Sequence, residues 1–398
     1  MKHFLKSIVA GLLALLARGI LLKYRPKVVM VTGSVGKTST KDAVAAALHS
    51  TFHLRASEKS YNSEFGVPLT IIGAKNPWTN PYAWVRVIGE ALALIFLPNH
   101  YPKLLVLEVG ADSPGDLKRI LHIATPDVVV VTKLPEVPVH VEAYASAAAV
   151  REEEFAPAYA LPAGAPLIIS ADDPYAKHLA SRLSAQVTTY GFEKDADVHL
   201  TDAKVLLSGT TPLGMHSNVT IGKTTHALTT LGALGRPQLY APAAAVACAL
   251  ALGMTTKDAL KALESYVPPS GRARILKGKN SSVLLDDSYN ASPSAVEEAL
   301  SSLSLVPAKR RIAVLGDMLE LGRYSAEEHE RIGKLAAKHA DIVVGVGPRA
   351  IKLSDAAFGT HKNKNRAHHF DEAYAAAVYL SGMIETGDVI LVKGSQSI

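Results

Sequence analysis

Residues 31–40, VTGSVGKTST, combine glycines, a lysine and hydroxyl side chains in the manner of a loop that binds phosphate. Gly33 and Gly36 allow a tight turn that directs backbone N–H groups at an anion, and a following helix would add its positive N-terminal end. Lys37 could reach terminal phosphates, and the Thr38 hydroxyl could bind Mg²⁺. Only two residues separate Gly33 from Gly36, so the loop is shorter than the general G-x-x-x-x-G-K-[ST] form.

A magnesium site needs hard oxygen ligands from more than one segment of the chain. Glu108 ends the apolar run LLVLE and is the best candidate, because a buried carboxylate at a strand end is costly without a charged partner. His140 follows another strand, and by itself reads as a surface histidine. Glu153 lies in REEEF, which by itself reads as a solvated acidic turn of a helix.

The elements that would position these residues alternate between strands and helices. A short β-rich run precedes the loop, and the loop is followed by a segment with helical spacing. Further apolar runs that end in polar residues lie at 104–112, 127–134 and 166–174. This alternation predicts a mostly parallel sheet with helices on both faces, whose ligands bind at the carboxyl ends of the strands. Residues 193–232 alternate as an antiparallel extension would.

A second α/β unit is expected after the turn-rich stretch PPSG. Its strand candidates are SVLLDDSY, RIAVLGDM, DIVVGVG and DVILVKG, with helices between them. The predicted fold is therefore α/β, with a P-loop-type central domain followed by a Rossmann-like C-terminal domain. We expect an apolar N-terminal helix in 1–26, the central domain in 27–268 and the C-terminal domain in 269–398.

Composition fits a globular chain with a core, since 48% of its 398 residues are hydrophobic and 20% are charged. Cys248 is the one cysteine, so a disulfide framework is excluded and a reducing compartment fits best. The net charge of +6 suits anionic small molecules or a membrane surface, and does not by itself indicate nucleic acid.

Two apolar segments bear on membrane contact. Residues 4–24 are expected to form a helix that lies in or on a membrane or packs on a partner, with a buried amphipathic helix as the alternative. Residues 81–103 have similar character, although core packing is the favoured explanation for this second segment. Together they favour peripheral membrane contact.

Eight motifs in order resemble the Mur ligases, and most closely the branch of that family that adds a dipeptide. The resemblance covers about residues 27–398, and these ligases use the shortened T-G-x-x-G-K-[ST] loop. The motifs are TGSVGKTST, YNSEFGVPLT, LEVGADSPGDL, ADDP, SGRARI, DDSYNASP, VLGDMLELG and LVKGSQS.

The resemblance implies an ATP-dependent amide ligase that joins D-Ala-D-Ala to a muramoyl tripeptide during peptidoglycan assembly. A substrate carboxylate attacks the γ-phosphate of ATP, and the incoming amine then attacks the acyl phosphate. Phosphorylation is needed because oxide is a poor leaving group. The resemblance also implies a cytoplasmic protein, at the inner face of the membrane if the apolar segments touch it, that acts as a monomer without nucleic acid.

Site residues follow from the same resemblance. Lys37 would hold the γ-phosphate, Thr38 and Glu108 would bind Mg²⁺, and His140 would serve a second Mg²⁺. The nucleotide-binding set comprises Gly33, Ser34, Gly36, Lys37, Thr38, Ser39, Arg272, Asp287, Tyr289 and Asn290. The residues expected to contact the muramoyl peptide or the incoming amine are Asn62, Asp317, Glu320, Lys393 and Ser395.

The sequence departs from the family pattern in three ways. The family's carbamoylated lysine near REEEF has no counterpart between Lys133 and Lys177, so Glu153 is expected to present a carboxylate in its place, with Glu152 as the competing choice. The stretch from Thr132 to His140 is about two residues longer than the family pattern. The family's N-terminal uridine-nucleotide domain has no counterpart in the apolar N-terminal segment, which suggests a membrane-proximal or lipid-linked acceptor.

Two alternatives stay open. One is a Mur-like ligase with another acceptor, of the folate type or the type that polymerises amino acids. The other is a noncatalytic nucleotide-binding partner of a cell-wall complex.

Overall fold

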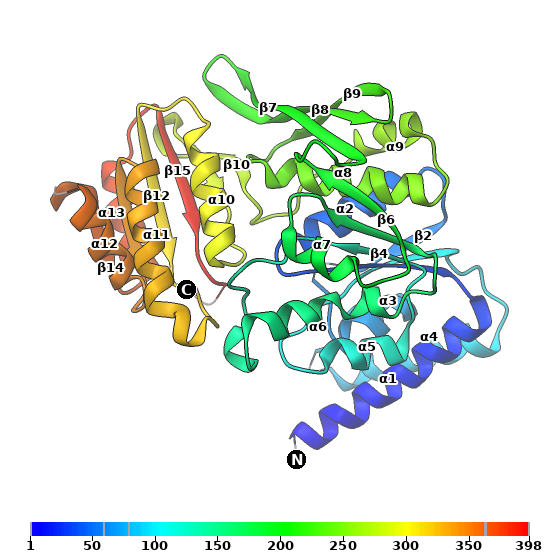
Figure 1. Ribbon diagram of the computed structural model, residues 1–398. Helices are drawn as coiled ribbons and strands as arrows, with labels where there is room; N and C mark the ends of the chain where they lie inside the picture. The colour runs from blue at the N-terminus through cyan, green and yellow to red at the C-terminus, as the bar shows by residue number, and fades with distance from the viewer. Residues whose placement is uncertain (1, 59, 79, 362–363, 397–398) are drawn as a thin grey trace. The chain divides into compact units, whose positions relative to one another are not determined.

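The computed structural model describes residues 2–58, 60–78, 80–361 and 364–396, and it is shown in Figure 1. The chain divides into two compact units. The first contains residues 1–134, 148–199 and 241–266, and the second contains residues 135–147, 200–240 and 267–398.

The first unit is built on parallel strands in the order β2-β3-β1-β4-β5-β6. The four central strands, β3, β1, β4 and β5, are rich in valine, leucine and isoleucine because helices cover both faces of a parallel sheet, whereas β2 and β6 are more polar. Their bounds are β1 Lys27–Thr32, β2 Leu54–Ala56, β3 Leu104–Glu108, β4 Val128–Val131, β5 Pro166–Ser170 and β6 Gln186–Gly191.

Helices complete the first unit and bury apolar side chains in it. Their bounds are α1 Lys2–Tyr24, α2 Lys37–Leu48, α3 Gly66–Ile72, α4 Pro81–Phe96, α5 Asp116–Ile123, α6 Ala147–Tyr159, α7 Pro174–Ala180, α8 Pro237–Ala251 and α9 Thr256–Leu263. Helix α8 starts in the second unit and carries Cys248, whose thiol is fully buried, so that burial raises its pKa to about 12.

Strand β1 lies between β3 and β4, and this order fixes where a ligand can bind. The chain leaves β1 towards one side of the sheet and returns to the other side at β4. Loops that follow the two flanking strands therefore diverge above β1, which is where open α/β sheets bind ligands. The glycine-containing loop 33–36, called the phosphate-type loop below because it resembles a phosphate-binding loop, begins directly at the end of β1.

An antiparallel extension follows, as the alternating pattern of residues 193–232 predicted. Strand β7, Val198–Ser208, starts parallel to β6 and runs on into the second unit. It is followed by the hairpin of β8, Thr211–Ile221, and β9, Thr224–Leu231.

The C-terminal part of the second unit contains a six-stranded sheet in the order β10-β11-β15-β12-β13-β14, parallel except for β10. The α/β fold class is confirmed, although β10 and β14 were not expected from the sequence. The bounds are β10 Arg274–Lys277, β11 Val283–Asp286, α10 Pro293–Ser304, β12 Arg310–Gly316, α11 Ser325–His339, β13 Ile342–Val346, α12 Ile351–His361, β14 Ala367–Phe370, α13 Ala373–Met383 and β15 Asp388–Lys393.

Candidate active site

The loop between β1 and α2 contains a glycine, Gly33, at which any side chain would be strained. Gly33 has φ +114°, and a Cβ at this position would lie 2.4 Å from Thr132 Oγ1. Thr132 cannot easily move away, because its N–H and its hydroxyl both donate to the Thr32 carbonyl at 2.9 Å. The Lys133 carbonyl accepts from Ser34 N at 3.0 Å and so holds the loop from the β4 side.

We expect Gly33→Ala to destabilise the fold by about 1–3 kcal/mol through backbone strain alone, with the steric clash in addition. Gly36→Ala is the matched control, since Gly36 has φ +90° but open space where a methyl group would lie. Thermal unfolding of both variants tests this expectation. Equal losses of stability would show that contact with Thr132 is not what requires glycine at position 33.

Helix α2 begins at Lys37, directly after its N-cap residue Gly36, which has no side chain that could cap the helix. The N–H groups of a first helical turn have no acceptor within the helix, and together with the helix dipole they favour the binding of an anion. The Lys37 ammonium lies over the same loop, where it donates to the Gly33 carbonyl and, at 3.4 Å, to the Ser34 carbonyl. A phosphate bound at this helix end would meet both backbone donors and the lysine charge.

Side-chain oxygens that could bind Mg²⁺ lie beside the loop, at the end of β3. Thr38 Oγ1 donates to Glu108 Oε1 at 3.1 Å, and it lies 3.3 Å from Ser60 Oγ. Glu108 is 1% exposed. Its own N–H donates to Ser57 Oγ at 3.1 Å, and the buried Lys41 ammonium donates to the Ser57 carbonyl at 2.7 Å. Lys41, Ser57 and Ser60 are supporting residues that the sequence did not reveal.

Asn62, which the sequence analysis assigned to the muramoyl peptide, lies at the same place as Lys37. A Cβ on Gly110 would lie 3.1 Å from Asn62 Nδ2 and 3.3 Å from Lys37 Cε. Gly110 N donates to the Asn62 carbonyl at 3.1 Å. Gly110 therefore permits the amide of Asn62 and the stem of Lys37 to share one edge of the site.

Glu154 is the carboxylate of α6 that reaches the phosphate-type loop. It is 2% exposed, and its Oε2 accepts from the Ser34 hydroxyl. Its backbone carbonyl accepts from Thr32 Oγ1 at 2.6 Å, which fixes α6 against the end of β1. Burial raises the pKa of Glu154, while the charge of Lys37 and the hydrogen bond from Ser34 act in the opposite direction.

The two glutamates expected from the sequence at this position lie elsewhere. Glu153 Oε1 accepts from Gly115 N at 3.1 Å and from Leu117 N at 3.0 Å, so it caps the start of α5. The Glu152 side chain is partly exposed and bonds to Arg182 at 2.9 Å. The signal for Glu154 was present in the sequence, because it lies four residues from the buried Val150 and four from the buried Ala158.

In the second unit the structure gathers four residues of the expected nucleotide set. The guanidinium of Arg272 lies 4.0 Å from the ring centroid of Tyr289. Asp287 Oδ1 accepts from Ala273 N at 3.1 Å, which ties the segment before β10 to the loop after β11. Lys393 Nζ donates to Asp287 Oδ2 at 2.7 Å and to the Asn290 carbonyl at 2.9 Å.

Several of the residues expected to border the amine substrate form hydrogen bonds within the second unit. Lys393 is buried and holds the loop after β11. Asp317 Oδ1 accepts from Arg349 N at 3.0 Å and Ala350 N at 2.7 Å, and its carbonyl accepts from Ser395 N at 3.1 Å. Because β11, β15 and β12 are neighbours in the sheet, these side chains collect at its carboxyl edge.

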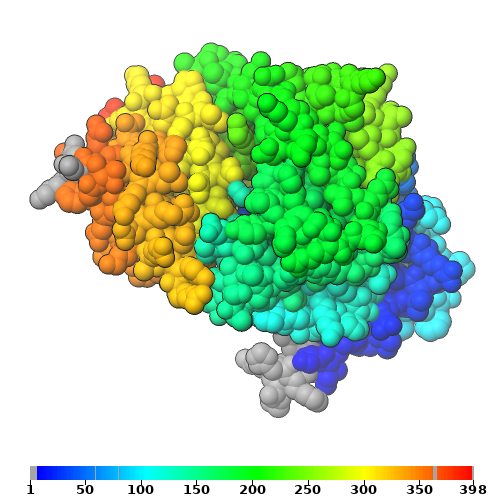
Figure 2. Space-filling model, in the orientation of Figure 1, coloured from blue at the N-terminus to red at the C-terminus, as the bar shows by residue number. Residues whose placement is uncertain are grey.

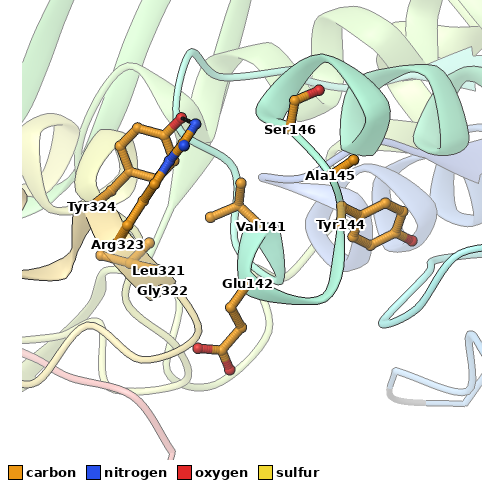
Figure 3. Close-up of a pocket in the computed structure, with 9 residues that line it drawn as sticks. All are labelled: Val141, Glu142, Tyr144, Ala145, Ser146, Leu321, Gly322, Arg323 and Tyr324. Carbon is orange, nitrogen blue, oxygen red and sulfur yellow. Dashed lines mark hydrogen bonds between the residues drawn. The ribbon is translucent and has the colours of Figure 1, made fainter.

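His140 and Glu320 contact each other, with 2.8 Å between His140 Nδ1 and Glu320 Oε2. Both residues have φ +63°, so a left-handed backbone turn presents each side chain. Beside them a cavity of about 230 Å³ lies between residues 141–146 and 321–324. Figure 3 shows Arg323 and Tyr324 at one side of this cavity and Tyr144 and Ser146 at the other.

The donor set around Thr38 fits Mg²⁺ better than a transition metal. Among the described residues no three His, Cys, Asp or Glu side chains form a metal cluster. One carboxylate and one hydroxyl beside a phosphate loop are the kind of site Mg²⁺ uses, because that ion takes few protein ligands and completes its shell with phosphate oxygens and water. Thr38 and Glu108 are the residues present that could hold it.

Fold and site together define an α/β nucleotide-dependent enzyme with a phosphate loop and an adjoining hard-oxygen site. The profile described as "Mur ligase middle domain" matches residues 31–249, and that described as "Mur ligase, glutamate ligase domain" matches residues 271–396. The chain belongs to the Mur ligase family.

Relatives of known name within that family include two ligases that add D-alanyl-D-alanine. The UDP-N-acetylmuramoyl-tripeptide–D-alanyl-D-alanine ligase of Bacillus subtilis is 26% identical over 385 residues, which cover 96% of this chain and 76% of that protein. The ligase of the same name from Escherichia coli K12 is 28% identical over 379 residues, or 93% of this chain and 74% of that protein.

Solved structures agree with this placement. The MurF ligase of Thermotoga maritima in complex with ADP matches with a TM-score of 0.80 and 26% identity, covering 98% of this chain and 81% of that chain. A folylpolyglutamate synthase of Mycobacterium tuberculosis, complexed with ADP and AMPPCP, matches with a TM-score of 0.66 and 13% identity, covering 96% and 92% of the two chains, which shows a shared fold.

Proposed function

We propose that this chain is an ATP-dependent amide ligase that joins D-Ala-D-Ala to a muramoyl-tripeptide precursor of peptidoglycan. The main structural support for the proposal is that Lys37, Thr38 and Glu108 lie together at the N-terminal end of α2. The names of the relatives from Bacillus subtilis and Escherichia coli support the substrates, and the ADP complex of the Thermotoga maritima relative supports the nucleotide.

The chemistry proceeds in two transfers. An oxygen of the tripeptide carboxylate attacks the γ-phosphorus of ATP, the bond to the bridging oxygen breaks, and ADP leaves. The amine of D-Ala-D-Ala then attacks the acyl carbon of the resulting acyl phosphate. Phosphate leaves with the electron pair of the broken C–O bond, the nitrogen gives up a proton, and an amide is formed.

Charge neutralisation is the main contribution of the first unit. Lys37 and the N–H groups at the start of α2 hold phosphate oxygens, and they oppose the repulsion between the carboxylate and the nucleotide. Thr38 and Glu108 are proposed to hold Mg²⁺, which when bound screens phosphate charge and orients the phosphate oxygens. Asn62 is proposed to face the muramoyl peptide from beside Lys37.

We place Glu154, rather than Glu153 or Glu152, in the role that the family gives to a carbamoylated lysine. Glu154 is buried at the phosphate loop, whereas Glu153 is engaged as a cap and Glu152 is paired with Arg182. A glutamate presents a carboxylate without the need for carbamoylation. His140 remains our proposal for a second magnesium, and Ser34, Ser39 and the group of Arg272, Asp287, Tyr289 and Asn290 remain proposals for nucleotide contacts.

The pocket for the incoming amine is proposed to involve Glu320 and the neighbouring cavity beside residues 141–146. Asp317 and Lys393 support that edge of the sheet through the hydrogen bonds described above, and Ser395 Oγ accepts from Leu319 N at 3.2 Å. We further propose that the enzyme acts as a monomer in the cytoplasm, at the inner face of the membrane, and without nucleic acid.

Release of phosphate from ATP tests this function. We expect release to require both a muramoyl tripeptide and D-Ala-D-Ala, and we expect hydroxylamine to trap the acyl phosphate as a hydroxamate when the dipeptide is left out. Mass spectrometry of the product then identifies the acceptor from a panel that includes folate-type and glutamate-type substrates. Phosphate release that no pair of acid and amine stimulates would instead indicate a noncatalytic nucleotide-binding protein.

A further inference from the structure

Helices α1 and α4 expose two apolar stripes on the surface of the first unit. Among the described side chains, the large apolar ones that are exposed on α1 are Ile8, Leu12, Leu15 and Leu22, and those on α4 and the turn before it are Trp78, Tyr82, Val85, Leu92 and Phe96. Spacings of three, four and seven residues place each helical set on one face of its helix. Leu15, Leu22 and Phe96 are 68%, 72% and 76% exposed, so these side chains are not part of the core.

The two helices are fastened to one another, so their stripes belong to one surface. Lys23 Nζ donates to the carbonyls of Leu94 at 2.8 Å and Leu97 at 2.6 Å, which caps the end of α4. Tyr24 OH donates to the same Leu94 carbonyl at 2.8 Å. Gly19, which lies between Leu15 and Leu22 in the sequence, faces the side chain of Ile95. In Figure 2 the dark blue α1 and the cyan segments lie together at the lower right.

Helix α1 is held on the first unit by its opposite face. Leu13, Leu16, Ala17 and Ile20 are at most 6% exposed and pack in the core. Residues 7–24 are long and apolar enough to cross a membrane, yet only 28% of that window is buried in the fold. Crossing a bilayer would require the four core side chains to leave their partners, whereas lying on a bilayer would bury only the side chains that are already exposed.

Charge around this surface matches an anionic bilayer. Residues 1–27 and 74–103 contain nine lysines and arginines and one acidic residue, Glu90. Because the whole chain has a net charge of +6, the remaining residues are slightly acidic, and the positive charge belongs to these two segments. Arg18 and Arg86 are exposed on the two helices, although Arg86 is shared with Glu90 at 3.5 Å. Basic residues near an apolar helix face attract acidic lipid headgroups.

Aromatic residues at the edge of the surface fit the same partner. Tyr82 is 86% exposed and Trp78 is 76% exposed, and the Trp84 indole donates to the Trp78 carbonyl at 3.1 Å. Tryptophan and tyrosine concentrate at the level of lipid headgroups, where the ring is apolar and its N–H or O–H stays hydrated.

We infer that the α1–α4 surface binds the face of a bilayer containing anionic phospholipid, with both helices lying in the interface plane. The location at the membrane that is proposed above would depend on this surface. It requires neither ATP nor ligation, so it can fail while the ligase function stands, and the reverse also holds.

Tryptophan fluorescence of the full chain tests the inference, since Trp78 and Trp84 are its only tryptophans. We expect vesicles of phosphatidylcholine with phosphatidylglycerol to shift the emission to the blue, and brominated lipids to quench it. Flotation with the vesicles should show binding that high salt weakens. Vesicles of phosphatidylcholine alone should bind less of the protein.

Variants test whether vesicle binding depends on the α1–α4 surface or on any exposed apolar residues. The triple change Leu15→Gln, Leu22→Gln and Phe96→Gln should lower binding about 100-fold, because it removes three side chains that would enter the interface. The matched control is Phe358→Gln, Tyr374→Gln and Val378→Gln on α12 and α13, which should bind as before. Arg18→Gln with Arg86→Gln should lower binding about 30-fold on anionic vesicles alone.

Nucleotide binding and thermal unfolding of each variant show whether the fold is intact. The inference is overturned if the unchanged protein does not bind either vesicle. It is also overturned if the α1–α4 variants bind as well as the control. A dimer in solution that the α1–α4 triple change dissociates would assign the surface to a second copy of the chain.

Discussion

Replacing Lys37 with methionine is expected to lower kcat/KM for ligation about 100- to 1,000-fold, the usual cost of losing a preorganised charge that stabilises the transition state. Methionine keeps most of the stem that packs beside Gly110 and removes only the ammonium over the Gly33 carbonyl. Affinity for ADP should fall far less, since the N–H groups at the start of α2 remain. Steady-state kinetics and calorimetry measure the two effects separately.

Two further variants serve as comparisons for Lys37→Met. Lys118→Met removes a lysine from an exposed position of α5 and should leave ligation unchanged. Lys37→Arg keeps the charge but alters its shape, and should recover only part of the rate because a guanidinium does not replace a point charge at a phosphate. Equal activity of Lys37→Met and the unchanged enzyme would contradict a role for this loop in phosphoryl transfer.

Replacing Glu154 with glutamine is expected to lower ligation and raise stability together. We expect kcat/KM to fall about 100-fold at low Mg²⁺, with more Mg²⁺ needed for half-maximal rate, if this carboxylate serves the metal. Glutamine has the same shape and can still accept from Ser34, yet it carries no charge into a buried position. Removing a buried charge in this way often stabilises a protein by about 1–3 kcal/mol.

The stability gain should depend on pH in a definite direction. Burial raises the pKa of Glu154 in the folded chain, so the folded state holds this proton more tightly than the unfolded state does. The resulting stabilisation is present below the ordinary carboxyl pKa and is lost as the pH rises through the folded-state pKa. Glu154→Gln should therefore equal the unchanged protein in acid and exceed it at neutral and higher pH, as denaturant unfolding at several pH values would measure.

The adjacent glutamates are matched controls on the same helix. Glu153→Gln should lower stability by about 1 kcal/mol, because it weakens the cap on α5. Glu152→Gln, at a partly exposed position, should change little. Neither should alter the Mg²⁺ dependence of ligation. If that dependence changes in Glu153→Gln and not in Glu154→Gln, the carboxylate has been assigned to the wrong residue.

Features that depend on neighbouring residues could be predicted from the sequence. The strand, the glycine turn and the helix start of the phosphate-type loop follow from local backbone requirements, and residues 27–48 fold accordingly. Glu108 could be placed beside the loop because the carboxyl ends of parallel strands meet at one edge of a sheet. For the same reason the α/β character of both sheets could be predicted from the order of apolar runs.

Features that depend on how helices pack could not be predicted in the same way. Each step along α6 turns a side chain by about 100°, so only the packing of Val150 and Ala158 decides that Glu154 faces the loop while Glu153 reaches α5. Lys393 could not be known to hold Asp287 and Asn290, since the contact joins strand ends more than one hundred residues apart.

The N-terminal helix shows most clearly which features the sequence predicts and which depend on packing. Its apolar character was evident from the sequence alone, because hydrophobicity is a property of the residues themselves. Which of its leucines are buried was decided by the tertiary structure, since α1 packs Leu13 and Leu16 into the core and leaves Leu15 and Leu22 in solvent. Composition therefore determined that this segment is apolar, and only packing against α3, α4 and α5 decided which face it exposes.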